Sequence, residues 1–160
     1  HTNKELAGKT LGIFGLGRIG KALAQRAVAL DVKVQYFDVV RQSEAEKEWG
    51  LKYLFPEELL SSSDIISYHL PKTSFTHHLI NRNSLRKMRP DALLINSSRG
   101  YIQDENAIVE ALNSGQIYGA GLDVFEVEPL PENSPLRKLE NVVLTPHSAP
   151  DNESLILAVR

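Results

Sequence analysis

Residues 11–20 constrain the fold of this chain more than any other stretch, because a short apolar run breaks there into three closely spaced glycines. Gly15 can adopt the positive φ of a tight turn, Gly17 leaves room for a pyrophosphate against bare backbone, and Gly20 lets a helix pack closely on a strand. The N–H groups at the start of that helix would face the anion. The helix itself is predicted by apolar residues at helical spacing, namely Ile19, Leu23, Ala27 and Leu30.

The context of this glycine motif matters, because glycine turns between a strand and a helix also occur without a ligand. A second strand is predicted by alternating apolar residues that end at Asp38, close to the spacing expected for a carboxylate that accepts hydrogen bonds from the adenosine ribose. Asp38 would repel a 2′-phosphate, so the pattern favours NAD over NADP. Arg41 is interpreted as a solvated loop charge, and the alternative for the whole unit is a structural turn beside a surface aspartate.

The composition limits the class of protein. With 160 residues, 42% of them hydrophobic, the chain is long enough for one domain with a proper core. A formal net charge of -2 without runs of like charge suggests neither a nucleic acid nor a membrane as partner. The absence of cysteine excludes disulfides and thiolate chemistry. Because no apolar stretch is long enough to span a membrane and the N-terminus is too polar for a signal peptide, we expect a cytoplasmic protein.

Strands and helices alternate along the rest of the chain. Apolar runs predict strands at 51–54, 64–69, 92–96, 117–124 and 141–145, and caps and periodicity predict helices at 43–50, 56–63, 81–88 and 104–113. The second helix of the chain is predicted to start with a capping box from Ser43 to Glu46 and to end at Gly50. Six or seven strands alternating with helices predict an α/β fold, a Rossmann-type doubly wound parallel sheet with helices on both faces.

Several polar residues follow the predicted strands at the edge where such sheets bind ligands. His69 is expected either to line the cofactor cleft or to hydrogen-bond a loop. Arg99, beside Gly100, could hold a carboxylate by bidentate hydrogen bonds, or it could cap a helix or pair with a structural aspartate. His77 and His78 are adjacent and would point apart on a helix, so we expect no metal site there.

Hydride transfer to or from a nicotinamide must be matched by a proton transfer, which requires a general acid and base. His147 follows a strand and a Thr-Pro pair, and a carboxylate such as Glu128 bonded to its ring would favour the imidazolium. Arg99 would bind an acid and polarise its carbonyl. Each residue has a structural alternative, but the three together indicate a catalytic site.

At this point the chain resembles the D-isomer-specific 2-hydroxyacid dehydrogenases from residue 6 to residue 147, through motifs at 15–20, 96–100, 121–129 and 145–147. The resemblance implies that Arg99 orients the substrate, Glu128 assists the catalytic His147, and Asp123 contacts the nicotinamide amide. It implies NAD as the cofactor, with contacts from Gly15, Gly17, Arg18, Ile19, Gly20, Asp38, His69, Leu70, Pro71, Ser98, Arg99, Asp123 and His147.

The chain also departs from this family. Residues 148–150 replace a usual Ala or Gly followed by Gly, and residues 72–76, Lys-Thr-Ser-Phe-Thr, replace a usual Leu-Thr-Pro-Glu-Thr. Family members carry a second domain that supplies backbone donors for the substrate carboxylate. The only methionine is Met88, and an amphipathic helix that starts at Asp151 stops early. We therefore expect residues 1–160 to be the NAD-binding domain of a longer protein, with 151–160 starting a connecting helix, weak NAD binding and little turnover.

The function that the resemblance implies is hydride transfer between NAD(H) and a small D-2-hydroxy acid or 2-oxo acid, in a protein that is a homodimer at full length. The substrate within this class stays open. An alternative is an NAD(H)-sensing interaction domain of the same fold, similar to the C-terminal-binding-protein corepressors, which would bind short transcription-factor peptides. A third possibility is a nucleotide-binding domain without catalysis, in which Asp38→Ala would leave NADH affinity unchanged.

Overall fold

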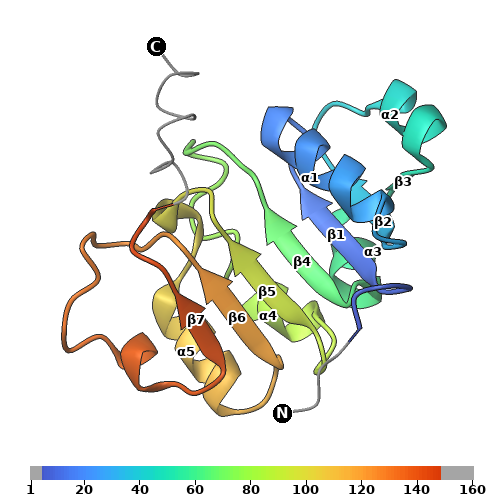
Figure 1. The fold of residues 1–160 in the computed structure, drawn as a ribbon. Coiled ribbons are helices and arrows are strands. Elements are labelled where there is room, and N and C mark those ends of the chain that lie inside the picture. The colour runs from blue at the N-terminus through green and yellow to red at the C-terminus, as the bar shows by residue number, and fades with distance from the viewer. Residues whose placement is uncertain (1–4, 149–160) are drawn as a thin grey trace.

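A seven-stranded parallel sheet with the order β3-β2-β1-β4-β5-β6-β7 forms the centre of the structure (Figure 1). The structure is a computed structural model that describes residues 5–148. Its strands are β1 (Thr10–Phe14), β2 (Lys33–Phe37), β3 (Lys52–Tyr53), β4 (Ile65–Tyr68), β5 (Leu93–Asn96), β6 (Gly119–Leu122) and β7 (Val142–Leu144). The predicted parallel sheet is confirmed, whereas the helix expected from Asp151 onward lies outside the described residues.

Helices connect most of these strands and lie on both faces of the sheet. They are α1 (Arg18–Val28), α2 (Ser43–Trp49), α3 (Pro56–Ser62), α4 (Arg82–Lys87) and α5 (Glu105–Asn113), with short 3-10 turns at Gly100–Ile102 and Pro135–Lys138. β1 pairs with both β2 and β4, and the chain changes direction across the sheet between these two neighbours. Such a switch point leaves a crevice at the carboxyl ends of the strands, where open α/β sheets bind ligands.

The two faces of the sheet carry separate hydrophobic clusters. One packs α1 and α2 against β1 and β2, with Ile13, Ala24, Val34, Tyr36 and Ala45 among its members. The other packs α3, α4 and α5 against the opposite face, with Leu59, Ile66, Leu85, Leu94 and Ile108 among its members. The doubly wound arrangement is therefore confirmed.

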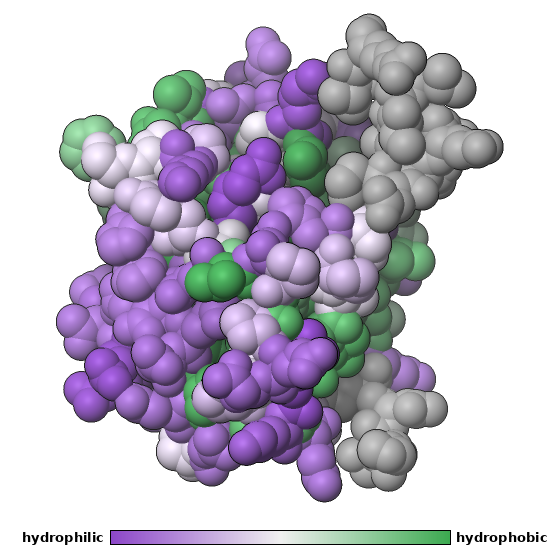
Figure 2. All heavy atoms as spheres, turned by 90° about the vertical axis from the view of Figure 1, so that its left-hand side faces the viewer, coloured by the Kyte–Doolittle hydropathy of each residue, from purple (hydrophilic) through white to green (hydrophobic). Residues whose placement is uncertain are grey.

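The face that α1 covers is left open over β5, β6 and β7 by the described part of the chain (Figure 1). On β5, Leu93 and Ile95 are only partly buried, and Val143 of β7 is 69% exposed. The β7 edge and the loop before it are largely hydrophilic, with scattered hydrophobic residues (Figure 2). Helical cover within residues 5–148 is thus complete on one face and partial on the other.

The start of α2 differs from the expected capping box. Gln42 is the N-cap and makes no side-chain cap bond, so the predicted pairing of Ser43 with Glu46 is wrong. Glu46 instead accepts hydrogen bonds from the Tyr36 hydroxyl at 2.7 Å and from Arg41 at 2.8 and 2.9 Å. The Arg41 and Tyr36 hydrogen bonds lower the pKa of Glu46 to about 2. The buried Tyr36 hydroxyl and the Arg41 guanidinium therefore bind the carboxylate that the capping box would have used. The predicted helix end at Gly50 is confirmed by the left-handed backbone of that residue.

Candidate cofactor and substrate site

The glycine turn after β1 is shaped by contacts that leave no space for side chains at two of its three glycines. Gly15 has φ +91, and a Cβ there would lie 2.5 Å from the His69 carbonyl oxygen. A Cβ on Gly20 would lie 2.2 Å from the Gly15 carbonyl oxygen. Gly17, the N-cap of α1, has nothing within 4 Å of its would-be Cβ. The fold therefore requires Gly15 and Gly20, whereas the space at Gly17 is open to a ligand.

A cleft of about 760 Å³ lies beside this turn and is lined mainly by apolar side chains. The predicted cofactor residues that line it are Gly15, Gly17, Asp38, His69, Leu70 and Pro71. Arg18 and Ile19 form the first turn of α1 and are exposed, with Ile19 at 70%. The structure thus places residues from the ends of β1, β2 and β4 around one cleft at the switch point.

Asp38 follows β2 and faces the glycine turn. Its Oδ2 accepts a hydrogen bond from the Leu16 N–H at 2.7 Å, and its Oδ1 accepts one from the Val40 N–H at 3.1 Å. These two bonds orient the carboxylate at the cleft. Arg41, predicted to be a solvated loop charge, is exposed but paired with Glu46, and its guanidinium lies 5.5 Å from the centre of the Tyr53 ring.

His69 was expected to line the cofactor cleft or to hydrogen-bond a loop, and the structure places it at the cleft with a bond to strand β4 instead of a loop. It lines the cleft, and its Nε2 lies 2.9 Å from the Ser67 hydroxyl oxygen. Burial lowers the pKa of His69 below its usual range. The neutral form of the His69 imidazole is therefore favoured. An uncharged ring is suited to form a wall of the cleft, and less suited to bind a ligand through charge.

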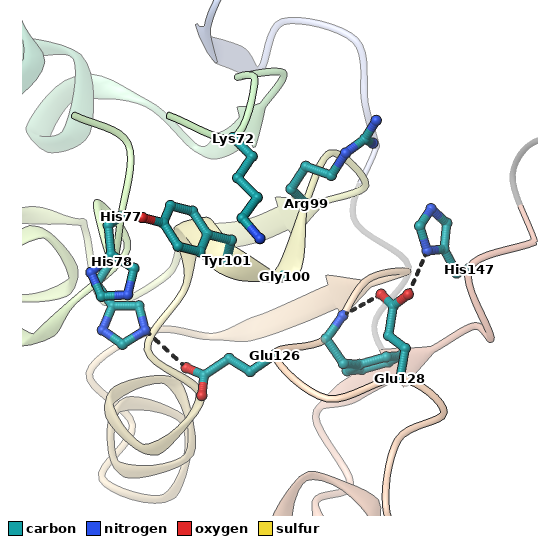
Figure 3. A pocket seen from close by; sticks show the side chains of 10 residues that line it. Lys72, His77, His78, Arg99, Gly100, Tyr101, Glu126, Glu128 and His147 are labelled. Carbon is teal, nitrogen blue, oxygen red and sulfur yellow. Dashed lines mark hydrogen bonds and ion pairs between the residues drawn. The ribbon is translucent and has the colours of Figure 1, made fainter. Parts of the chain in front are cut away.

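Glu128 and His147 form a hydrogen-bonded pair at the edge of a second cavity, of about 350 Å³ (Figure 3). The Nδ1 atom of His147 lies 2.8 Å from Oε2 of Glu128, and Oε1 of Glu128 accepts a hydrogen bond from the Phe125 N–H at 2.9 Å. The His147 hydrogen bond, with a smaller contribution from that N–H, holds the pKa of Glu128 below its usual range. Within residues 5–148, the Nε2 atom of His147 has no hydrogen-bond partner.

Arg99 lines the same cavity, and its guanidinium makes no contact with the Glu128–His147 pair (Figure 3). Its Nη1 donates a hydrogen bond to the Ser98 carbonyl oxygen at 2.6 Å. The backbone beside it is held tightly, because a Cβ on Gly100 would lie 1.8 Å from the Phe125 carbonyl oxygen. The structure therefore brings the three predicted catalytic residues to one cavity without direct contact between Arg99 and the other two.

A buried amide pair that the sequence interpretation missed supports this cavity. The Asn96 amide donates to the Gln103 side chain at 2.7 Å and to the Arg99 carbonyl oxygen at 3.2 Å, and the Gln103 amide donates to the Val124 carbonyl oxygen at 2.9 Å. Asn96 also accepts hydrogen bonds from the Ser98 N–H and hydroxyl. This network joins the end of β5 to the end of β6. The sequence feature that could have indicated it is a polar residue, Asn96, in an otherwise apolar run.

Asp123 holds the segment that carries His147. Its Oδ1 accepts hydrogen bonds from the Thr145 hydroxyl at 2.5 Å and from the Ser148 N–H at 3.1 Å. His147 itself has φ +53, a left-handed conformation that is uncommon for a residue with a side chain. The structure thus gives Asp123 a positioning role, and its contact with a nicotinamide stays a prediction.

His77 and His78 lie in a turn rather than on a helix, and the expectation that their side chains point apart is wrong. Their rings stack at 4.0 Å with an interplanar angle of 16°, and the backbone of His78 has a positive φ of 47°. His78 Nε2 lies 3.2 Å from Glu126 Oε1, so the cavity contains a second His–Glu pair. Residues 5–148 contain no group of three or more side chains suited to a metal ion.

Lys72, in the segment that departs from the usual family pattern, adds a second cation to the cavity. Its ammonium lies 4.8 Å from the centre of the Tyr101 ring (Figure 3). Within the described chain no carboxylate pairs with it or with Arg99. The cavity therefore holds two cations without a carboxylate partner beside its two His–Glu pairs.

Across residues 5–148, no helix has the length and apolar character needed to cross a membrane.

Comparisons with known proteins agree with the fold described above. The profile of the family described as "D-isomer specific 2-hydroxyacid dehydrogenase, NAD binding domain" matches residues 1–149. A glyoxylate reductase of Thermococcus litoralis is 54% identical over 142 residues, which cover 89% of this chain and 43% of that protein. A glyoxylate reductase of Korarchaeum cryptofilum is 50% identical over 145 residues, 91% of this chain and 44% of that protein. The solved structure of D-lactate dehydrogenase with NAD+ from Lactobacillus jensenii superposes with a TM-score of 0.89 at 34% identity, covering 97% of this chain and 50% of that one. The chain thus spans less than half the length of these curated relatives.

Proposed function

The chain belongs to the D-isomer specific 2-hydroxyacid dehydrogenases, as their NAD-binding domain, and from this premise we propose that the protein transfers a hydride between NAD(H) and a small D-2-hydroxy acid or 2-oxo acid. The observation that carries the proposal is the Glu128–His147 pair, which shares a cavity with Arg99 at the ligand-binding edge of the sheet. An acid–base pair and a cation are what reduction of a 2-oxo acid requires.

The residues around the glycine turn fit a dinucleotide. The open space at Gly17 and the α1 N-terminus suit the pyrophosphate, and the Asp38 carboxylate suits the ribose hydroxyls. We assign NAD rather than NADP because Asp38 would repel a 2′-phosphate and the nearby Arg41 is already paired with Glu46. The contacts expected of Arg18, Ile19, Leu70, Pro71 and Ser98 belong to this proposal.

The proton chemistry follows from how His147 is held. Because Glu128 takes the Nδ1 side of the ring, Nε2 is free to give a proton to the carbonyl oxygen of a 2-oxo acid during reduction, or to take it from the hydroxyl during oxidation. NADH supplies the hydride when it is bound. Arg99 would swing from the Ser98 carbonyl to the substrate, where its charge binds the carboxylate and polarises the carbonyl.

We place the rest of the catalytic machinery outside this sequence. Residues 1–160 would form the NAD-binding domain, with 151–160 starting a connecting helix to a substrate domain. The partly exposed apolar residues Leu93, Ile95 and Val143 support packing of further chain on the open sheet face. The full-length protein would be a cytoplasmic homodimer. The relatives above are reductases and dehydrogenases, so no finding favours the corepressor alternative.

Three measurements test the proposal. Calorimetric titration of this chain with NADH should detect weak one-to-one binding, whereas a steady-state assay of the chain alone should show little turnover. The full-length enzyme should oxidise NADH with at least one of glyoxylate, hydroxypyruvate, pyruvate or phosphohydroxypyruvate. Full turnover by this chain alone would contradict the two-domain proposal, and failure of the full-length enzyme with every 2-oxo acid would contradict the activity.

A further inference from the structure

Gln103 is a polar residue in an apolar part of the core. It is 0% exposed and directly follows the 3-10 turn Gly100–Ile102. Its sequence neighbours Ile102 and Ala107 belong to the hydrophobic cluster on that face of the sheet. Burying an amide costs free energy unless its donor and its acceptor both have partners, and a methionine would fill a similar volume without that requirement. An amide at this position therefore indicates a role beyond filling space.

The two ends of the Gln103 amide bind two different connections of the sheet. Its Oε1 accepts a hydrogen bond from the Asn96 amide at 2.7 Å, and the Asn96 amide also donates to the Arg99 carbonyl oxygen at 3.2 Å. Its Nε2 donates to the Val124 carbonyl oxygen at 2.9 Å. One side chain is thus bonded to the segment after β5, which carries Arg99, and to the segment after β6, which carries Glu128.

The bond to Val124 reaches the Glu128–His147 pair through a single peptide group. The Val124 carbonyl and the Phe125 N–H belong to the same planar unit. The carbonyl accepts from Gln103, and the N–H donates to Oε1 of Glu128 at 2.9 Å. Oε2 of Glu128 lies 2.8 Å from Nδ1 of His147 (Figure 3). Because the carbonyl and the N–H of a planar trans peptide point in opposite directions, a tilt of the carbonyl would move the N–H that holds Glu128.

A close backbone contact restricts the same stretch of chain. A Cβ on Gly100 would lie 1.8 Å from the Phe125 carbonyl oxygen and 2.7 Å from the Glu126 nitrogen. The Gln103 N–H donates to the Gly100 carbonyl oxygen at 3.0 Å. The backbone of Gly100 therefore blocks movement of residues 125 and 126 toward it, while the Gln103 side chain holds the preceding peptide. A fully bonded polar network fixes such an arrangement more narrowly than apolar packing does.

We propose that Gln103 is a positioning residue for the dehydrogenase reaction: it orients the Val124–Phe125 peptide, and through this peptide it aligns the carboxylate of Glu128 with His147. Gln103 is not among the described residues that line the cavity, so it acts through these groups and touches no substrate. Its replacement should slow the proton transfer and leave cofactor binding unchanged. The inference rests on the proposed function, in which His147 is the acid and base.

The test compares two buried glutamines in the full-length enzyme, with steady-state kinetics of 2-oxo acid reduction. Gln103→Met keeps the approximate side-chain volume and loses both hydrogen bonds. We expect kcat to fall by about tenfold and the KM for NADH to stay unchanged. Gln35→Met is the matched control, because Gln35 is 6% exposed and donates to the Ser62 and Ser63 hydroxyls at 2.7 and 2.8 Å. It should lower the urea midpoint to a similar extent and leave kcat unchanged.

A double variant shows whether the effect passes through Glu128. If it does, kcat of Gln103→Met/Glu128→Gln should be no lower than kcat of Glu128→Gln alone, because the carboxylate that Gln103 aligns is already gone. A further drop of the full size seen in Gln103→Met would overturn the inference. A change confined to the KM for the 2-oxo acid would also overturn it, since the effect would then come from substrate binding at Arg99.

The remaining outcomes separate this inference from the proposed function. In an enzyme that reduces a 2-oxo acid, an unchanged kcat for Gln103→Met, or an equal loss for Gln35→Met, overturns the inference alone. If Gln103→Met does not fold, Gln103→Glu replaces it with the same expected loss of kcat, because its carboxylate can accept from Asn96 but cannot donate to the Val124 carbonyl. Failure of both variants to fold while Gln35→Met folds would make Gln103 a purely structural residue and overturn the inference. If the wild-type enzyme reduces no 2-oxo acid, the proposed function fails and the inference fails with it.

Discussion

The imidazole of His147 is oriented by Glu128, whose Oε2 atom lies 2.8 Å from the Nδ1 atom of the ring. The other Glu128 oxygen is held by the Phe125 N–H at 2.9 Å, so the carboxylate cannot turn freely. The bond joins two residues that are 19 positions apart and lie on separate loops. In the proposed mechanism this bond presents Nε2 to the substrate, and the first prediction depends on it.

His147→Gln in the full-length enzyme should lower kcat for 2-oxo acid reduction by about 10²- to 10⁴-fold, because the proton donor is lost. Glu128→Gln should have a smaller effect of the same sign. NADH affinity, measured by fluorescence titration, should stay unchanged in both. The second His–Glu pair of the cavity supplies the control: His78→Gln should retain most of the activity, and an equal loss there would argue against a special role for His147.

Gly17→Ala and Gly20→Ala should separate binding from folding. A methyl group on Gly17 meets nothing within 4 Å, so urea unfolding should be nearly unchanged while NADH affinity falls by about tenfold or more. Gly20→Ala would push a methyl group against the Gly15 carbonyl oxygen and should destabilise the fold by about 1–3 kcal/mol. Unaltered NADH binding by Gly17→Ala would indicate that the turn is only structural.

Asp38→Ser should weaken NADH binding by about tenfold, because charge-assisted hydrogen bonds to the ribose are lost. The same change should narrow the gap between NADH and NADPH, since it removes the charge that repels a 2′-phosphate. Calorimetric titration with both cofactors measures the two effects. Glu44→Gln, which removes a negative charge from the nearby helix α2, is the control and should alter neither affinity.

His69 should make the stability of the chain depend on pH. Burial lowers its pKa in the folded state below the usual 6.5, so the unfolded chain binds a proton more readily. This contribution to stability is complete above pH 6.5 and is lost as the pH falls through the lower, folded-state pKa. Urea midpoints between pH 7.5 and 5 should therefore fall less in His69→Gln than in the wild type, and parallel curves would contradict the prediction.

Much of the fold could be predicted from local pattern. The apolar runs located all seven strands, Pro56 marked the start of α3, and Gly50 marked the end of α2. The same pattern predicted the wrong partner for Glu46. A capping box is predicted from residues close in sequence, whereas the Tyr36 hydroxyl that bonds Glu46 comes from strand β2. The local pattern also gave a wrong prediction for His77 and His78. Their rings stack because the two residues lie in a turn, and hydrophobic periodicity does not predict that turn.

The candidate site, like the fold, could be predicted from the sequence only in part. Motif spacing placed Asp38, Arg99, Glu128 and His147 after strands, and parallel strands deliver such residues to one edge. It could not foresee that Asp123 holds the Thr145–Ser148 segment, that Asn96 and Gln103 join two loops, or that Arg99 donates to the Ser98 carbonyl oxygen. Those facts depend on side-chain directions and on contacts between distant segments.

The sequence by itself determined the alternation of strands and helices, the glycine turn, and the types of residue offered at the ends of the strands. Only the tertiary structure decided which of these residues meet, which carboxylates are already occupied, and that Phe75 is left in water within the cofactor cleft. The physical reason is that backbone propensity and hydrophobic period act over a few residues. Pairing and exposure, in contrast, follow from packing between elements that lie far apart in the chain.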